Sequence, residues 1–202
     1  MGRFRQIIIF FPFFFFCFFS GSAVYSSETD EPGKAKKDTV QSRSLTLPRG
    51  CSLKLLADRD YFSALNVAIE GARREIVMSF YLFKADGSES NYPQIITKGL
   101  INAAARGIQV EVLLERSDDA ADQVYLNNRA TMEKLVGGGI HVRFDSSGKT
   151  THAKLAVIDG RYTFIGSHNL TQAALRHNNE FSVLIDSADV AEEALRYIRN
   201  LR

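Results

Sequence analysis

Residues 46–202 predict an α/β fold, in which a mixed, mostly parallel β-sheet is flanked by helices on both faces. Strand-like apolar runs alternate with helix-like amphipathic segments over the first half of this region, as in folds whose helices cover a sheet. The runs Glu75–Phe83 and Ile108–Leu114 are too apolar to have a solvated face, which is typical of central strands. Asp159 and Gly160 separate two β-type runs, and this pair predicts a hairpin.

The elements before the hairpin are expected from their apolar spacing and their end signals. A short strand covers Leu53–Leu56, and Asp60 is the expected N-cap of the first helix. Pro93 suits the first turn of a second helix, because that position needs no backbone N–H. Gly107 ends this helix, since glycine readily adopts the left-handed conformation found after helix ends.

The elements after the second central strand follow the same rules. A third helix is expected to begin at Asp118 and Asp119 and to end at the three glycines 137–139. We read these glycines as a helix stop, because no Lys-Ser or Lys-Thr pair follows them as in a phosphate-binding loop. The remaining strands and the closing helix are expected at Ile140–Phe144, Ala153–Ile158, Arg161–Ile165, Phe181–Ile185 and Ala188–Leu201.

The first 23 residues have the three-part pattern of a secretory signal peptide. Two arginines precede an apolar run, Ile7–Phe19, and small residues follow it up to Ala23, the expected cleavage position. An uncleaved membrane anchor through residues 7–25 is the alternative, because this stretch carries no charge. Residues 24–45 are mostly polar and predict a flexible linker. The sequence therefore predicts a periplasmic or secreted protein or, with the anchor retained, a membrane-anchored one.

Composition sets wide limits on function. Hydrophobic residues make up 45% of the chain and charged residues 24%, as in ordinary globular proteins. The formal net charge of +2 is compatible with a phosphate-bearing substrate but is too small to predict nucleic-acid binding by itself. The four histidines are scattered, without a Cys pair or an HExxH spacing, so we expect neither a metal site nor a cofactor.

The residues that carry chemistry lie between positions 151 and 180. His152 and Lys154 are two apart at the entrance to a predicted strand, so their side chains point to the same side. Ser167 and Asn169 leave the adjacent strand of the hairpin, again two apart, and antiparallel pairing brings the two ends together. This set suits a phosphate diester: the imidazole can attack phosphorus, the ammonium offsets charge, and Ser and Asn can donate hydrogen bonds.

The pattern H-x-K-x4-D-x6-G-S-x-N resembles the signature of the phospholipase D superfamily, with His152, Lys154, Asp159, Gly166, Ser167 and Asn169 at its fixed positions. The order and length of the elements are similar to the small bacterial endonucleases of that superfamily, which carry one copy of the motif. Its phospholipases and cardiolipin synthases carry two copies in one long chain. The resemblance implies a phospholipase D/nuclease-like fold and makes residues 46–202 the catalytic domain.

The resemblance also implies a mechanism shared between two chains. His152 of one chain would attack phosphorus to form a phosphohistidine, and His152 of a second chain would serve as general acid and then as base. Lys154, Ser167 and Asn169 would bind the phosphate. Glu180 would hold the far ring nitrogen of His152. Since one chain has one motif, we expect a homodimer with its active site on the twofold axis.

Two questions stay open at the level of the sequence. Asp159 is a candidate catalytic residue, but its place in an Asp-Gly turn has a sufficient structural explanation. His168, at the variable position of the motif, is expected to line the groove. The single motif favours an exported, metal-independent endonuclease acting on DNA or RNA. The alternative is a phospholipase D or cardiolipin hydrolase acting on phospholipid head groups at a membrane.

Overall fold

The computed structural model describes residues 50–146 and 148–201. The predicted export segment, 1–23, and the predicted linker, 24–45, lie outside these residues. None of the helices in the described part of the chain is long and apolar enough to cross a membrane.

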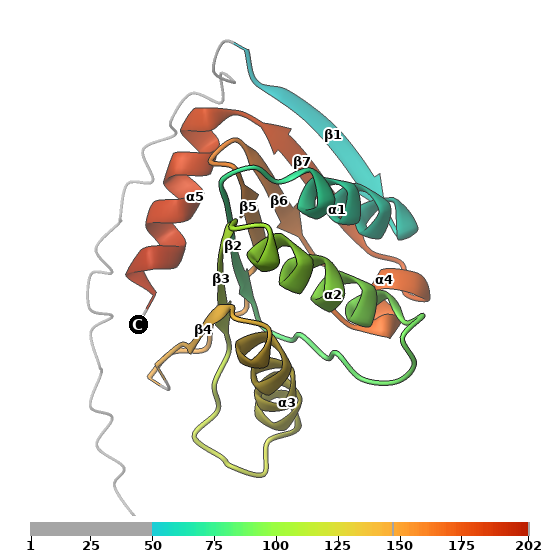
Figure 1. The fold of residues 1–202 in the computed structure, drawn as a ribbon, viewed down its shortest axis with the longest axis vertical. Helices are drawn as coiled ribbons and strands as arrows, with labels where there is room; N and C mark the ends of the chain where they lie inside the picture. Colours follow the sequence, from blue (N-terminus) through green and yellow to red (C-terminus); the bar gives the residue numbers. More distant parts are fainter. Residues whose placement is uncertain (1–49, 147, 202) are drawn as a thin grey trace, which may run out of the picture. The chain divides into compact units, whose positions relative to one another are not determined.

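Seven strands form a single mixed sheet in the order β1-β7-β6-β5-β2-β3-β4 (Figure 1). The most apolar strands, β2 and β5, lie at its centre, as expected for strands covered on both faces. The strands are β1 Ser52–Ala57, β2 Glu75–Phe80, β3 Gln109–Leu114, β4 His141–Phe144, β5 Lys154–Ile158, β6 Tyr162–Gly166 and β7 Phe181–Asp186.

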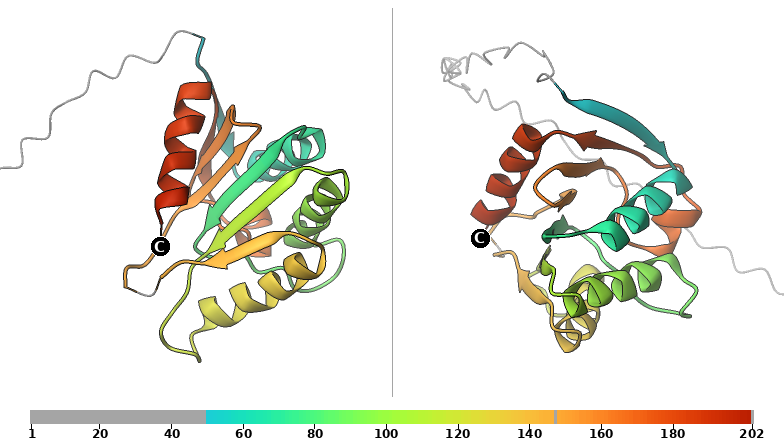
Figure 2. Two further views of the ribbon diagram at one scale, coloured as in Figure 1. Left: turned by 60° about the vertical axis from the view of Figure 1, so that its left-hand side comes forward. Right: turned by 45° about the horizontal axis from the view of Figure 1, so that its top comes forward.

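Helices cover both faces of this sheet, so the predicted α/β class is confirmed. Figure 2 shows α5 on one face and α1, α2 and α3 on the other. On its own side, α5 packs Ala191, Leu195 and Ile198 against Val77 of β2 and Leu155 of β5. The helices are α1 Arg59–Gly71, α2 Tyr92–Ala105, α3 Gln123–Gly137, α4 Gln172–Arg176 and α5 Ala188–Asn200.

The sheet is mixed, as expected, but the expected predominance of parallel pairing is wrong, because only two of the six neighbouring strand pairs in the described residues are parallel. Neighbours β2–β3 and β3–β4 are parallel, because helical crossovers connect these strands. The other four pairs, β2–β5, β5–β6, β6–β7 and β1–β7, are antiparallel. The hairpin explains part of this reversal: Asp159 and Gly160 both have positive φ, 57° and 61°, as a tight two-residue turn requires.

Two helix starts differ from the predicted ones. The third helix begins at Gln123 and not at Asp118, because the Asp122 side chain caps it by accepting from the Tyr125 N–H. The first helix begins one residue before Asp60, and its N-cap position is Asp58, whose side chain makes no capping hydrogen bond. The carboxylate of Asp58 is used elsewhere, as described below.

Candidate active site

Two motif residues, His152 and Lys154, lie where the chain enters β5. His152 is exposed just before the strand, and Lys154 is the first strand residue, with 8% of its surface exposed. Lys154 Nζ lies 2.9 Å from His152 Nδ1 and 3.1 Å from Nε2, and it donates to the His152 carbonyl at 2.9 Å. The prediction that both side chains face the same side is confirmed.

The pKa values of this pair are shifted in a direction that suits a nucleophile. Partial desolvation by the surrounding protein lowers the pKa of His152, and the neighbouring Lys154 ammonium lowers it further. Burial also lowers the pKa of Lys154, while the carboxylate of Glu180 opposes that change. A lowered pKa keeps the imidazole neutral near pH 7, and a neutral imidazole has the free lone pair that attack requires.

Tyr81 forms an aromatic wall beside this pair. Its ring centroid lies 4.5 Å from that of His152, and Lys154 Nζ lies 5.1 Å from the tyrosine centroid. The Tyr81 N–H donates to the Ala153 carbonyl at 2.9 Å, which joins the segment after β2 to the segment before β5. Sequence reasoning missed Tyr81, because a tyrosine directly after an apolar strand has no pattern of its own.

Ser167 and Glu180 form a second group, where β6 ends and β7 begins. Ser167 Oγ donates to the Glu180 carboxylate, and it accepts from the Phe181 N–H at 3.0 Å. The electrostatic effect of Glu180 on Lys154 connects this group to the first one. Gly166 allows the two strands to approach here, because a Cβ at this position would lie 2.4 Å from Ser182 Cα.

Within this chain, Glu180 has different partners from those that the resemblance implied. Its carboxylate accepts from Ser167 and from Asn178 Nδ2, the latter at 3.2 Å, and not from His152. Ser167 takes this carboxylate because antiparallel pairing of β6 and β7 places Ser167 beside Phe181, the residue after Glu180.

Asp159 is not brought to His152. It lies at the opposite end of β5, where its carboxylate accepts from the backbone N–H groups of Arg73, Arg74 and Glu75 at 2.8–3.3 Å. These bonds tie the hairpin turn to the start of β2. Of the two roles that the sequence left open, the contacts of Asp159 are those of the structural one.

Asn169 follows the motif loop and is partly buried. Its Oδ1 is buried and has no hydrogen-bond partner, so the protein does not fix the amide through this atom. The structure records no hydrogen bond between Asn169 and His152 or Lys154. Leu170, the next residue, forms a bridge with Phe83, which holds this part of the loop against the segment after β2.

The sequence predicted that His168 lines the groove, and this prediction is wrong, because the side chain is fully buried. Both ring nitrogens are engaged: Nδ1 lies 2.7 Å from Ser182 Oγ, and Nε2 lies 2.9 Å from the Asp58 carbonyl. The ring stacks on Tyr61 with centroids 4.3 Å apart. The two partners come from segments far from His168 in sequence, which is why the motif alone did not indicate this position. His141 and His177 are exposed.

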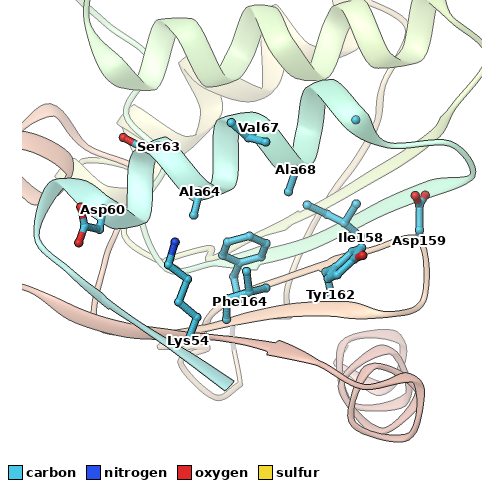
Figure 3. A pocket seen from close by; sticks show the side chains of 12 residues that line it. Lys54, Asp60, Ser63, Ala64, Val67, Ala68, Ile158, Asp159, Tyr162 and Phe164 are labelled. Atoms are coloured by element: carbon cyan, nitrogen blue, oxygen red, sulfur yellow. The ribbon is translucent and has the colours of Figure 1, made fainter. Parts of the chain in front are cut away.

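A cavity of about 670 Å³ adjoins His152. His152, Lys154 and Gly166 line it together with apolar side chains of β6, β7 and α5, among them Ile165 and Tyr197. A second cavity, of about 610 Å³, lies between α1 and the sheet, and Asp159 is at one end of it while Lys54 points into it (Figure 3). Because α1 and α5 cover opposite faces, the two cavities are separated by the sheet.

No group of three or more His, Cys, Asp and Glu side chains in residues 50–146 and 148–201 is placed to hold a metal ion. The polar groups of this region are instead one ammonium, which contacts His152 and belongs to Lys154, and the hydrogen-bonded hydroxyl and carboxylate of Ser167 and Glu180, the latter of which raises the pKa of Lys154. An ammonium and a hydroxyl can bind the non-bridging oxygens of a phosphate ester.

This fold and this site define a class of protein: the chain belongs to the phospholipase D superfamily, whose members hydrolyse or transfer phosphodiesters. The sequence model of the family described as "Cardiolipin synthase, PLD-like domain" matches residues 65–202. That match includes every residue of the H-x-K-x4-D-x6-G-S-x-N pattern.

Particular relatives carry different names. A phospholipase D of Rickettsia bellii is 32% identical over 155 residues, which are 77% of this chain and 65% of that protein. A cardiolipin synthase A of Yersinia pestis is 27% identical over 139 residues, 67% of this chain and 27% of that protein. This chain therefore spans about two thirds of the length of the phospholipases D that it matches.

The solved structures agree on the fold. Nuc from Salmonella typhimurium, a phospholipase D family member, superposes with a TM-score of 0.62 at 25% identity, over 75% of this chain and 93% of that one. NucT from Helicobacter pylori superposes with a TM-score of 0.59 at 19% identity, over 75% of this chain and 95% of that one.

Proposed function

We propose that this protein is an exported, metal-independent endonuclease that hydrolyses DNA or RNA through a phosphohistidine on His152. The observation that carries the proposal is the contact between the exposed imidazole of His152 and the buried ammonium of Lys154. The pKa of this imidazole is lowered, which favours its neutral form. Phosphodiesters are anionic, and an attacking group gains from a fixed positive charge at the point where the substrate must come closest. The match to nearly the whole of Nuc supports a single-domain enzyme.

The proposed reaction has two displacements. A ring nitrogen of His152 attacks phosphorus, the bond from phosphorus to the leaving oxygen breaks, and that oxygen takes a proton from His152 of the partner subunit. Water then attacks phosphorus as the partner's His152 accepts its proton, and the phosphorus–nitrogen bond breaks. Lys154 and Ser167 bind the phosphate oxygens, and the amide of Asn169, unfixed at Oδ1, can turn its NH2 toward them.

Phospholipid hydrolysis at a membrane is the second candidate, and one observation favours it. The cavity beside His152 is walled by apolar side chains such as Ile165, Ile185 and Tyr197. The charged backbone of a nucleic acid would bury little apolar surface against such a wall, whereas the acyl or glyceryl part of a lipid would bury apolar surface there. A retained anchor through residues 7–25 would also favour this candidate.

One assay separates the two candidates. The purified full-length chain is incubated in EDTA with labelled DNA, labelled RNA and vesicles of labelled phospholipid in parallel, with His152→Ala as the control. We expect nucleic-acid cleavage that survives the chelator, because Lys154 supplies the charge that a metal would otherwise supply. Cleavage of lipid alone would select the second candidate. Loss of all activity in EDTA, restored by a divalent ion, would contradict the mechanism.

We further propose that the active unit is a homodimer. Apolar side chains of β1, β6 and β7 lie exposed on the sheet face that α5 covers only in part, and Leu55, Phe181 and Ile165 are 59%, 55% and 45% exposed. An exposed apolar sheet face of this kind supports an interaction surface. It adjoins Gly166 and Ser167, so a second copy seated there would bring its own His152 near the first.

A further inference from the structure

His168 is held in one tautomer by its two partners. The Asp58 carbonyl can only accept a hydrogen bond, so His168 Nε2 must carry the proton that it donates there. A neutral imidazole then has an acceptor at Nδ1, and Ser182 Oγ, 2.7 Å away, donates to it. Burial lowers the pKa of His168, which favours this neutral form. All polar capacity of the ring is used, and its face is covered by Tyr61.

Asp58 is the second unusual residue of this region. Its φ of 48° and ψ of −117° lie where glycine is preferred, so the backbone of this aspartate is strained. Asp58 also makes two hydrogen bonds to one residue: its N–H donates to the Glu180 carbonyl at 2.9 Å, and its Oδ1 accepts from the Glu180 N–H at 2.9 Å. Asp58 thus fixes the backbone of Glu180 on both sides.

These contacts form one continuous chain of hydrogen bonds. His168 donates to Asp58, Asp58 holds the Glu180 backbone, and the Glu180 carboxylate accepts from Ser167 Oγ. Ser167 is the residue directly before His168, so the chain closes on itself. This closed loop of contacts includes Ser167, a proposed phosphate ligand, and the Glu180 carboxylate, which raises the pKa of Lys154, yet neither His168 nor Asp58 has a recorded hydrogen bond with His152 or Lys154.

We propose that His168 and Asp58 are a pair of positioning residues that hold Ser167 and Glu180 in the geometry required at the phosphate. The pair rests on the proposed function for the identity of the substrate, and on the hydrogen bonds alone for the placement of the two side chains. The stack on Tyr61 needs only an aromatic ring, so what the histidine adds at this buried position is its two hydrogen bonds.

The test compares variants that keep different parts of the histidine. His168→Phe keeps the ring and loses both hydrogen bonds, whereas His168→Gln has a donor that can reach the Asp58 carbonyl. With bis(p-nitrophenyl) phosphate as substrate, we expect kcat to fall about tenfold to a hundredfold in His168→Phe, because small misplacements of binding groups have effects of this size. We expect His168→Gln to recover most of the loss and the exposed control His141→Gln to behave as wild type.

A second measurement needs no turnover. Around Lys154, the titratable groups are His152 before β5, Tyr81 after β2 and Glu180 before β7. If His168→Phe frees Glu180, its carboxylate raises the pKa of Lys154 less, and the Lys154 ¹³Cε signal should titrate at lower pH than in wild type.

The outcomes separate the two proposals. An inactive wild type with a shifted Lys154 titration in His168→Phe would overturn the proposed function and keep the positioning pair. A His168→Phe variant with wild-type kcat, or with a lowered melting temperature and an unchanged Lys154 titration, would overturn the pair. Asp58→Asn, which keeps an acceptor for the Glu180 N–H, should lose less activity than Asp58→Ala.

Discussion

Lys154 affects His152 in two ways. As a cation 2.9 Å from Nδ1, it disfavours the protonated imidazole, so that the ring is more often neutral at a pH where an ordinary histidine is partly charged. As a phosphate ligand, the same ammonium would give up its contact with the His152 imidazole and bind an oxygen of the substrate phosphate. Tyr81 faces both groups and limits how far either can move. This contact therefore favours the neutral imidazole that the proposed attack needs, and it keeps the ammonium close to where phosphate would bind in the proposed reaction.

The pH dependence of His152 follows from these contacts. Because its folded-state pKa is lowered, the neutral form persists below pH ~6.5, the ordinary histidine value, and the acidic limb of the pH–rate profile should lie below it. Lys154→Met removes the neighbouring charge but leaves the desolvation, so the pKa of His152 should rise part of the way. An NMR titration of the His152 ring protons measures this. A pKa that stays constant or falls in the variant would contradict the assigned cause.

Buried polar side chains of α3 hold the backbone that carries Tyr81. Asn128 Oδ1 accepts from the Phe83 N–H at 2.8 Å, and its Nδ2 donates to the carbonyls of Tyr81 and Glu115 at 2.8 and 3.0 Å. The Thr131 hydroxyl, one turn further along the helix, accepts a hydrogen bond from the Ala85 N–H and donates one to the Phe83 carbonyl. Residues 81–85 continue the direction of β2 without a strand partner on that side, and the helix supplies the missing hydrogen bonds.

Asn128→Ala should therefore destabilise the protein strongly. It leaves one N–H and two carbonyls buried without partners, and each unsatisfied group costs about 1–3 kcal/mol. We expect the free energy of unfolding to fall by about 3 kcal/mol or more, measured by urea denaturation. Asn127→Ala is the matched control, because Asn127 donates only to Gln123 within the same helix. Equal effects of the two substitutions would show that the hydrogen bonds of Asn128 to Phe83, Tyr81 and Glu115 contribute nothing to stability.

The sequence predicted the elements better than the contacts between them. Apolar periodicity and the Asp-Gly pair placed every strand within a few residues, because burial on one face or two leaves a regular pattern. Asn128, Asp58 and His168 were missed because each has a backbone partner more than 40 residues away in sequence, and backbone groups leave no pattern. The sequence offered a local, structural role for Asp159 in the Asp-Gly turn. Its hydrogen bonds to the backbone at the start of β2 agree with that structural role.

At the scale of the whole molecule, one chain supplies half of the proposed chemistry. The described structure has one His152–Lys154 pair, and the two-step reaction needs an acid opposite the nucleophile. The exposed apolar side chains of β1, β7 and β6 lie on the sheet face that α5 covers only in part, and Ile165 lines the same cavity as this pair. A twofold axis beside Gly166 would bury that face and pair the two imidazoles across one phosphate.

A mixing experiment tests the shared site. Wild-type chains are refolded together with an equal amount of His152→Asn chains, so that subunits assort at random. If each chain held its own site, roughly half of the activity of an all-wild-type sample would remain. If both imidazoles serve one site, only the wild-type homodimer is active and roughly a quarter remains. Sedimentation confirms that the mixture is dimeric. A value near one half, or full activity at concentrations where the protein is monomeric, would rule out the shared site, because a lone His152 would then have to act without its partner's imidazole.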